Sequence, residues 1–356
     1  MLSAIVINYR NAADTAACVA SLLSDDPTVQ VVVVDNSADP QHADELHSRL
    51  NGSVQLIINR HNAGFGVACN QGLAACESNE VMLLNPDARV VPGALRRMQQ
   101  ILIESRANRQ RLAAVSPLQV WDEAGQWLLP PAWLPTGIGL WALTRASRSE
   151  RDAQRISYAY QALAKQVWQA AQAPLTAPTV IPQRALSGGA VMFRRDAIEQ
   201  VGGLFDERYF MYYEDSDLCL RLRRAGWQLG LVPQARAVHA WAHSASKVQW
   251  MEQARGQYLA KHFDGAGAWQ TRLARIHALP ALPNPLSVQT SSADEPHWQV
   301  PAHLQGGWLL EVSPSALLVP SIGHFAEGPV ACLPAALRMR LGSGPVYTRV
   351  SARDEA

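Results

Sequence analysis

Short apolar runs alternate with helix-like stretches over the first third of the chain. Leu2–Ile7 and Val29–Val34 are apolar along most of their length, and similar runs precede Asn59 and Asn85. Uninterrupted apolar runs of this length favour strands that are buried on both faces, as in a sheet covered by helices on two sides. The pattern therefore predicts an α/β fold.

Polar residues follow each of these predicted strands. They are Asn8, Asp35, Asn59–Asn62, and the pair Asn85 and Asp87. In open α/β sheets, ligands bind beyond the carboxyl ends of the strands. We expect these polar residues to converge on one ligand-binding crevice.

The regular alternation is interrupted between residues 127 and 182. This stretch begins rich in Trp and Pro, continues with a polar and basic segment, and ends in a helix-like run from Ile156 to Gln172. We interpret it as a helical insertion into the sheet domain. Alternation then resumes, with a strand predicted at Ala190–Phe193 and another ending near Val238.

The composition changes again near residue 278. Residues 279–296 have the Pro and Ser content of a linker, and residues 297–356 contain short apolar runs separated by Gly and Pro. We predict a main domain over residues 1–278 and a small β-rich C-terminal accessory module over residues 297–356.

Composition narrows the functional classes. A hydrophobic content of 48% supports a buried core, and a net charge of +1 gives no basic field for nucleic acid. The five cysteines include no CxxC pair, so we expect neither a disulfide framework nor a zinc cage. No signal peptide and no membrane-spanning run is apparent, so we expect a cytoplasmic protein.

A cluster of carboxylates marks one predicted helix, in the segment "YYEDSDLCLRLRRAG". Glu214, Asp215 and Asp217 fall in its first turn, where the helix dipole stabilises anions. We expect Asp217 to pair with Arg221 at the i,i+4 spacing and Gly226 to end the helix. This spacing alone does not distinguish a catalytic carboxylate from a well-capped helix.

Several segments occur together in a characteristic order: "IVINYRN", "VVVVDNS", "NRHNAGFGVACNQG", "LLNPDA", and "SGGAVMFRRDAIEQVGGLFDERYFMYYEDSDLCLRLRRAGW". Over roughly residues 1–265 the chain resembles the family 2 glycosyltransferases, and most of all their bacterial rhamnosyltransferase-like members. The resemblance implies a GT-A fold, a Rossmann-like mixed sheet flanked by helices that binds nucleotide sugars.

The resemblance also suggests residues for the donor site. Asp35 stands where the family places an acidic residue that contacts the nucleobase, and Asn8 is a candidate for the same pocket. Asn62, Gly64 and Asn70 belong to the segment that lies along the nucleotide in the family. The alternatives are that Asp35 is a turn residue and that the glycine-rich segment is a tight strand–helix turn.

The position of the family's Asp-x-Asp metal motif is taken here by Asn85-Pro86-Asp87. Oxygen ligands at a strand end suit Mg²⁺ or Mn²⁺, and the resemblance implies that His239 is a further ligand. Because Asn85 replaces the first aspartate, Asp87 is left with most of the coordination. A second histidine, His243, follows shortly after.

For the acceptor side, the resemblance makes Asp215 the general base. Gly188, Gly189, Tyr209, Tyr213 and Glu214 are candidates to floor the acceptor site, since aromatic faces stack on sugar rings. The alternative is that the tyrosines are core residues beneath a loop.

Together these features predict an inverting glycosyltransferase, with dTDP-rhamnose as the favoured donor and UDP-sugars next. The predicted acceptor is a hydroxyl of a bacterial cell-surface glycan or a lipid-linked glycan. The Trp-, Pro- and Arg-rich insertion would suit peripheral contact with the inner face of a membrane. No feature indicates an oligomeric state.

Two other functions are alternatives to this one. The Asn at position 85 and the added C-terminal module would fit a catalytically silent nucleotide-sugar-binding or scaffold protein. A nucleotide-dependent oxidoreductase is disfavoured, because no proper G-x-G-x-x-G follows the first strand.

Overall fold

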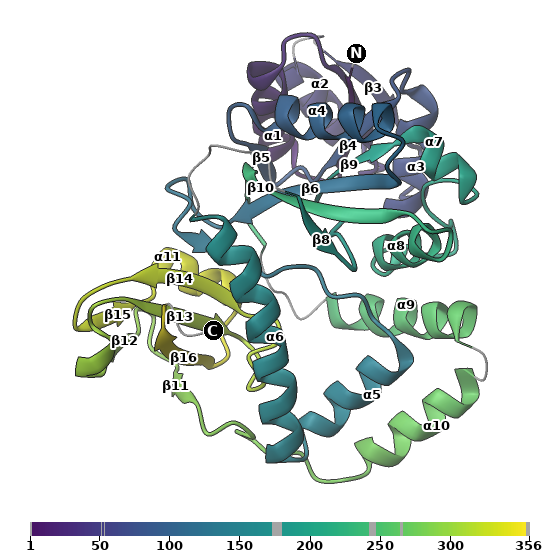
Figure 1. Cartoon of the computed structure of the whole chain (residues 1–356). Helices are drawn as coiled ribbons and strands as arrows, with labels where there is room; N and C mark the ends of the chain where they lie inside the picture. Colours follow the sequence, from purple (N-terminus) through teal and green to yellow (C-terminus); the bar gives the residue numbers. More distant parts are fainter. Residues whose placement is uncertain are drawn as a thin grey trace.

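A large mixed β-sheet forms the centre of the protein in a computed structural model (Figure 1). The structure describes residues 2–50, 52, 54–172, 180–241, 247–263 and 266–353. The strands of the N-terminal two thirds are β1 (Leu2–Asn8), β2 (Gln30–Asp35), β3 (Gln55–Ile58), β4 (Glu80–Leu84), β5 (Ala88–Val90), β6 (Leu112–Val120), β7 (Trp127–Leu128), β8 (Ile181–Gln183), β9 (Ala190–Arg194) and β10 (Gln228–His239).

Helices connect and cover these strands. They are α1 (Ala12–Asp25), α2 (Pro40–Leu50), α3 (Phe65–Ala75), α4 (Ala94–Ala107), α5 (Gly137–Ala146), α6 (Glu150–Ala170), α7 (Arg195–Gln200), α8 (Glu214–Arg224), α9 (Lys247–His262) and α10 (Ala266–His277). None of the helices in the described parts of the chain is long and apolar enough to cross a membrane.

The sheet combines parallel and antiparallel pairing. β1 pairs in parallel with β2 and β4, and β2 with β3, which gives the βαβ arrangement predicted from the sequence. β9 is antiparallel to both β4 and β6, whereas β6 and β10 run parallel. The mixed sheet flanked by helices is confirmed.

Alternate residues of the strands enter two apolar cores on opposite faces of the sheet. In β1, Leu2, Ala4 and Val6 pack with α1, α2 and α4, whereas Ile5 and Ile7 pack with α3, α7 and α8. Burial on both faces is the physical reason that these strands have uninterrupted apolar sequences.

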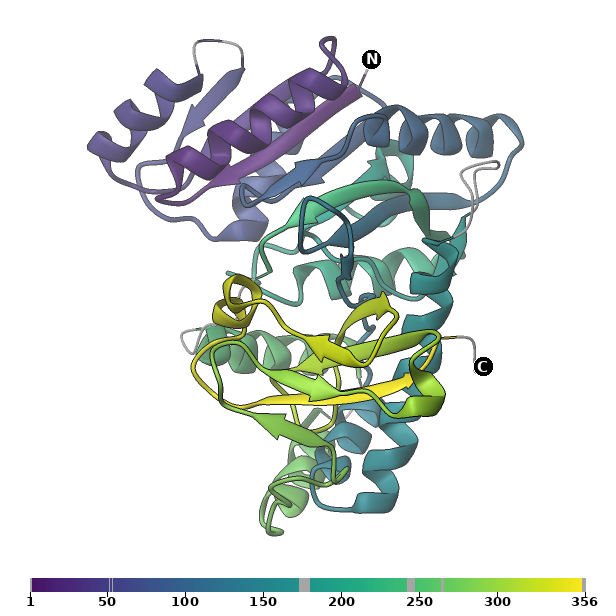
Figure 2. The same ribbon diagram turned by 90° about the vertical axis from the view of Figure 1, so that its left-hand side faces the viewer.

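The C-terminal strand-rich region extends the main sheet. Its elements are β11 (Gln289–Ser291), β12 (His297–Gln299), β13 (Trp308–Ser313), β14 (Ile322–Ala326), β15 (Val330–Cys332), α11 (Ala335–Arg338) and β16 (Val346–Ala352). β14 pairs with β7, so the sheet continues from one region into the other. In Figure 2 these strands lie in front, and α6 runs beside them.

Helix α6 joins the predicted insertion to both regions. The indole Nε1 of Trp168 donates a hydrogen bond of 3.0 Å to the carbonyl of Leu129, and Gly323 of β14 packs directly against the Trp168 ring. Residues 173–179 of the predicted insertion lie outside the described residues. The domain boundaries near residues 278 and 297 stay a prediction.

Candidate active site

Asp35 ends β2 in a fully buried position, and its neighbours hold one of its two oxygens. Asn8 Nδ2 donates to Asp35 Oδ1 at 2.8 Å, and the backbone N–H and hydroxyl of Ser37 donate to the same oxygen. Asp35 Oδ2 is buried without a hydrogen-bond partner among the described residues. A buried carboxylate oxygen without a donor is costly unless a bound molecule supplies one.

Asn8 is fully occupied by these internal contacts. Besides Asp35, its Nδ2 donates to Ser37, and its Oδ1 accepts from the hydroxyl of Thr15 and the N–H of Asn11. An amide has two donor hydrogens and two acceptor lone pairs. Asn8 therefore holds Asp35 in place and has no hydrogen-bonding group left for a ligand.

A network of asparagines fixes the loop after β3 against the end of β2. Asn36 donates to Asn62 Oδ1 at 2.8 Å and accepts from Asn59 Nδ2 and from the N–H of Ala63. Asn62 in turn accepts from the N–H of Gly64 at 3.0 Å. The predicted donor residue Asn62 is thus held by Asn36, the residue that follows Asp35 in the chain.

Gly64 and Asn70 face the protein rather than an open crevice. A Cβ on Gly64 would lie 2.7 Å from the carbonyl oxygen of Phe210. The amide of Asn70 makes reciprocal hydrogen bonds with the backbone of Phe205, at 2.9 and 3.0 Å. Both residues anchor the 205–210 loop, which leads into α8, to helix α3.

Asp87 and His239 meet where β4 ends and β10 ends. His239 Nε2 lies 3.2 Å from Asp87 Oδ1, and Asn85 Nδ2 lies 3.5 Å from the same nitrogen. The other ring nitrogen, Nδ1, lies 2.7 Å from Gln119 Oε1. A carbonyl oxygen only accepts, so Nδ1 carries a proton, and in the neutral ring the lone pair of Nε2 then faces Asp87.

This pair fits a divalent cation. Two neighbouring ligands of an octahedral ion at 2.0–2.1 Å stand about 3 Å apart, close to the 3.2 Å separation of His239 Nε2 and Asp87 Oδ1. The Gln119 carbonyl orients the imidazole as the outer-shell partners of metal-binding histidines do. The amide side chain of Asn85 borders the pair. His243 lies outside the described residues.

Two consecutive glycines connect this pair to Asp215. The N–H of Gly188 donates to Asp215 Oδ2 at 3.2 Å. A Cβ on Gly189 would lie 2.8 Å from His239 and 3.2 Å from Asn85 Nδ2. Since adjacent Cα atoms are about 3.8 Å apart, the candidate base and the candidate metal ligands border one small region.

Asp215 and Glu214 begin α8 in an environment that disfavours negative charge. Burial raises the pKa of Asp215, against hydrogen bonds from Gly188 and Ser216 that lower it. Burial and the neighbouring Asp215 raise the pKa of Glu214 to about 8, and Glu214 Oε2 has no partner among the described residues. Perturbed carboxylates in a confined site are typical of functional positions.

The backbone just before α8 is strained. Tyr212 and Tyr213 have φ values of 72° and 66°, which are uncommon for residues with bulky side chains. This conformation turns the chain so that Glu214 and Asp215 point back towards Gly188 and α3. Such strain persists only where the surroundings hold it, and it is often found at functional sites.

The remaining predicted acceptor residues divide in two. Tyr213 is partly exposed and packs beside Tyr258. Tyr209 is only 1% exposed, so it occupies the core position that was the alternative to acceptor binding. Asp217 is fully buried and pairs with Arg221 at 2.8 Å, as predicted, and also with Lys261 and His262. Asp217 therefore fastens α9 to α8.

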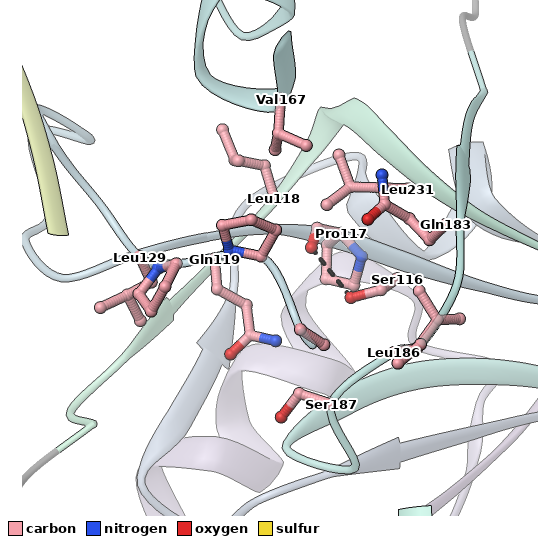
Figure 3. A pocket seen from close by; sticks show the side chains of 14 residues that line it. Ser116, Pro117, Leu118, Gln119, Leu129, Val167, Gln183, Leu186, Ser187 and Leu231 are labelled. Atoms are coloured by element: carbon pink, nitrogen blue, oxygen red, sulfur yellow. Dashed lines mark hydrogen bonds between the residues drawn. The ribbon is translucent and has the colours of Figure 1, made fainter. Parts of the chain in front are cut away.

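A hollow adjoins the glycine pair on the side of the insertion (Figure 3). Leu118, Val167 and Leu231 form its upper side in the figure, and Gln119 and Ser187 its lower side. Gln119 is thus shared between the hollow and His239. Ser187 precedes the two glycines that were candidates for the acceptor site, whereas no local pattern indicated Gln119, which becomes part of the site only through its contact with His239.

The mixed sheet flanked by helices is the fold of the GT-A glycosyltransferases. The structure is similar to the crystal structure of GalNAc-T7 with UDP, GalNAc and Mn²⁺, with a TM-score of 0.52 and 15% sequence identity. The match covers 79% of this chain and 51% of that chain. At this identity the likeness concerns the fold alone.

Sequence comparison gives the family. The family model for Glycosyl transferase family 2 matches residues 3–109. The N-acetylglucosaminyl-diphospho-decaprenol L-rhamnosyltransferase of Mycobacterium tuberculosis is 30% identical over 264 residues, which cover 69% of this chain and 78% of that protein. Rhamnosyltransferase WbbL of Escherichia coli is 38% identical over 81 residues, 21% of this chain and 30% of that protein. The chain belongs to glycosyltransferase family 2 and is a glycosyltransferase.

Proposed function

We propose that the protein transfers rhamnose from dTDP-rhamnose, with inversion, to a hydroxyl of a lipid-linked or cell-surface glycan. The observation that carries the proposal is the placement of Asp215 and the Asp87–His239 pair against two consecutive glycines. A base and a site for the leaving diphosphate must flank the anomeric carbon, and in this proposal Asp215 would be the base and the Asp87–His239 pair would lie at the diphosphate. The names of the two relatives, both rhamnosyltransferases, support the choice of sugar.

In the proposed reaction, the Asp215 carboxylate takes the proton of the acceptor hydroxyl. The acceptor oxygen forms a bond to the anomeric carbon while the bond from that carbon to the diphosphate oxygen breaks, leaving its electron pair on the nucleoside diphosphate. A single displacement of this kind inverts the anomeric centre. Asp87 and His239 would hold a Mg²⁺ or Mn²⁺ ion, which would supply charge stabilisation for the diphosphate when bound.

The buried Oδ2 atom of Asp35 supports a uracil-like or thymine-like base. Both bases carry a ring N–H that can donate to a carboxylate, whereas the corresponding ring nitrogen of cytosine only accepts. Asn8 and Ser37 already occupy Oδ1, so Oδ2 is the oxygen left to receive such a donor.

A panel of nucleotides tests this donor assignment by thermal shift. Ligands that bind the native state raise its melting temperature. With Mn²⁺ present, we expect dTDP and UDP to raise it, dTDP-rhamnose to raise it at least as far, and CDP to leave it unchanged. An equal shift with CDP would contradict the role of Asp35, and no shift with dTDP-rhamnose would contradict the proposed donor.

A lipid-linked acceptor implies work at a membrane surface. In support, Ile138 of α5 is 68% exposed, Arg275 of α10 is exposed, and neither helix contains an acidic residue, although Arg145 of α5 pairs with Asp152 of α6. Cations near anionic lipid contribute about 1 kcal/mol each. We expect the protein to float with anionic vesicles but not with zwitterionic ones. Arg275→Gln should weaken its binding to anionic vesicles, and Arg96→Gln on α4 should leave that binding unchanged. Equal recovery with both vesicle types would contradict this part of the proposal.

A further inference from the structure

Strands β12 and β15 form a small two-stranded sheet that is separate from the main sheet. Their antiparallel register places His297 opposite Cys332 and Trp298 opposite Ala331. Trp298 and Ala331 are buried in an apolar core of the C-terminal region. Because side chains alternate between faces, His297 and Cys332 share the outward face, where opposed Cβ atoms stand about 4.5–5.5 Å apart.

Glu295 lies beside this pair, just before β12. One ligand atom from each of Glu295, His297 and Cys332 lies within 4.8 Å of the other two, and Cys332 Sγ is 4.0 Å from Glu295 Oε1. His297 Nδ1 is 2.9 Å from the backbone carbonyl oxygen of Glu295. A backbone carbonyl only accepts, so Nδ1 donates to it, and in the neutral ring Nε2 is then the nitrogen with a lone pair for a metal.

We propose that Glu295, His297 and Cys332 form a zinc-binding site. A thiolate, an imidazole and a carboxylate are the ligand types that Zn²⁺ takes in tetrahedral sites, and a water molecule would complete the four. A metal-binding histidine characteristically donates its other N–H to a carbonyl or carboxylate, as His297 does. The Asp87–His239 pair lacks sulfur, so the two sites differ in the metals they prefer.

The exposure of the cysteines agrees with this assignment. Cys18, Cys69, Cys76 and Cys219 are buried, and Cys332 alone of the five is partly exposed. The absence of a CxxC pair argued against a zinc cage. These ligands escaped that criterion because strand pairing, rather than local spacing, brings Cys332 to Glu295 and His297.

A metal ion at this site would stabilise the two-stranded sheet of β12 and β15. An isolated two-stranded sheet is marginally stable in water, and Glu295 and Cys332 sit at the open end of this one, beside the hydrogen bond from the Leu333 N–H to the Pro296 carbonyl. A metal that binds only the folded arrangement stabilises it. Zinc at this site is therefore structural and separate from the sugar-transfer chemistry.

The test is a titration of the full, metal-stripped chain with Co²⁺, a spectroscopic probe for zinc, in excess Mg²⁺. We expect one equivalent to produce a thiolate-to-cobalt charge-transfer band that Zn²⁺ abolishes. Cys332→Ser should remove the band, and His297→Gln or Glu295→Gln should weaken binding about tenfold or more. The controls His303→Gln, an exposed histidine of the same region, and His239→Gln should keep it.

Thermal melting provides the second readout. Zn²⁺ should raise the melting temperature of the parent chain and leave that of Cys332→Ser unchanged. The proposal is overturned if no thiolate band appears, if the band survives Cys332→Ser, or if it is insensitive to both His297→Gln and Glu295→Gln.

Discussion

At the scale of single residues, Asp215 is the proposed base, and it combines a position against Gly188 with a pKa that burial raises. Asp215→Asn keeps the shape of the side chain and removes the proton acceptor, so we expect kcat to fall by about 10²–10⁴. Burial disfavours the negative charge of Asp215, so the melting temperature of Asp215→Asn should equal or exceed that of the parent chain. The measurement is sugar transfer, or slow donor hydrolysis, alongside thermal melting.

Glu207→Gln is the matched control for Asp215→Asn, since Glu207 is an exposed carboxylate on the loop that leads to α8. It should leave kcat unchanged. The pH profile adds a check, because a base works when deprotonated and the raised pKa of Asp215 moves the acid limb of kcat/KM above the ordinary aspartate range. Unchanged activity in Asp215→Asn would refute the base assignment and favour a silent binding protein.

Glu214 should make stability depend on pH. Its pKa is raised to about 8 in the folded protein, whereas an unfolded glutamate titrates near 4.3. Between these values the folded state binds the extra proton, so the free energy of unfolding falls as pH rises, by up to about 1.4 kcal/mol per unit. Glu214→Gln should remove this dependence, measured by urea unfolding at pH 5, 6, 7 and 8.

The difference in the free energy of unfolding between Glu214→Gln and the parent chain shows whether the pKa of Glu214 is raised. Relative to the parent chain, Glu214→Gln should gain stability steadily up to about pH 8 and then level off. A constant difference across this range would show that Glu214 is ionised in the folded protein at neutral pH, with a cation or donor beside it.

At the scale of elements, the packing of the glycine-rich segment against the loop before α8 links donor and acceptor sides. Gly64 begins α3 with φ of 86°, and a Cβ there would lie 2.7 Å from the Phe210 carbonyl. Gly64→Ala combines a strained backbone with overpacking, so we expect a loss of about 2–4 kcal/mol and a higher KM for the donor. Chemical unfolding and donor kinetics measure the two effects.

Gly342→Ala is the matched control for this substitution. Gly342 of the C-terminal region has φ of 85° and ψ of −177°, close to the φ of 86° and ψ of 164° of Gly64, but a Cβ there would meet nothing within 4 Å. It should cost about 1 kcal/mol from the backbone alone, with donor KM unchanged. Equal losses at the two glycines would mean that contact with Phe210 is unimportant.

The sequence predicted the elements better than it predicted the contacts between them. Uninterrupted apolar runs gave the strands, and the i,i+4 spacing correctly gave the Asp217–Arg221 pair. Gly226, with φ of 81°, follows the C-cap of α8 as expected. These features depend on local sequence, which is why pattern and spacing reveal them.

The roles of Gln119, Asn36 and Gly189 could not be predicted in the same way. Gln119 reaches His239 across 120 positions, and Gly189 fits beneath His239 and Asn85 only after β9 has paired with β4. Likewise, Asn8 ends β1, Asn62 lies in the loop before α3 and Asn70 lies within α3, but their side chains make hydrogen bonds within the protein. Nothing in their local sequence indicated which partners would occupy them.

At the scale of the whole molecule, a buried ion pair ties the C-terminal region to α6. Glu311 of β13 is fully buried and pairs with Arg349 of β16 at 2.6 Å, while Gln161 of α6 donates to Glu311 at 2.6 Å. Arg349 also donates to Ser157 of α6 at 3.1 Å. The pair therefore links two strands of the C-terminal region to the predicted insertion.

Because of this link, we expect the chain to unfold in one transition rather than as two domains. Glu311→Gln leaves the largely buried Arg349 without its counter-charge, which should cost about 3–5 kcal/mol. The melting transition followed by donor binding and the one followed by tryptophan fluorescence should shift together, since an apolar cluster that contains Leu118, Trp168 and Leu309 joins the two regions. Glu311→Gln with Arg349→Met removes both charges and should recover much of the loss. If the fluorescence transition moved while the donor-binding transition stayed in place, the C-terminal region would be an independent module, as the linker-like composition of residues 279–296 suggested.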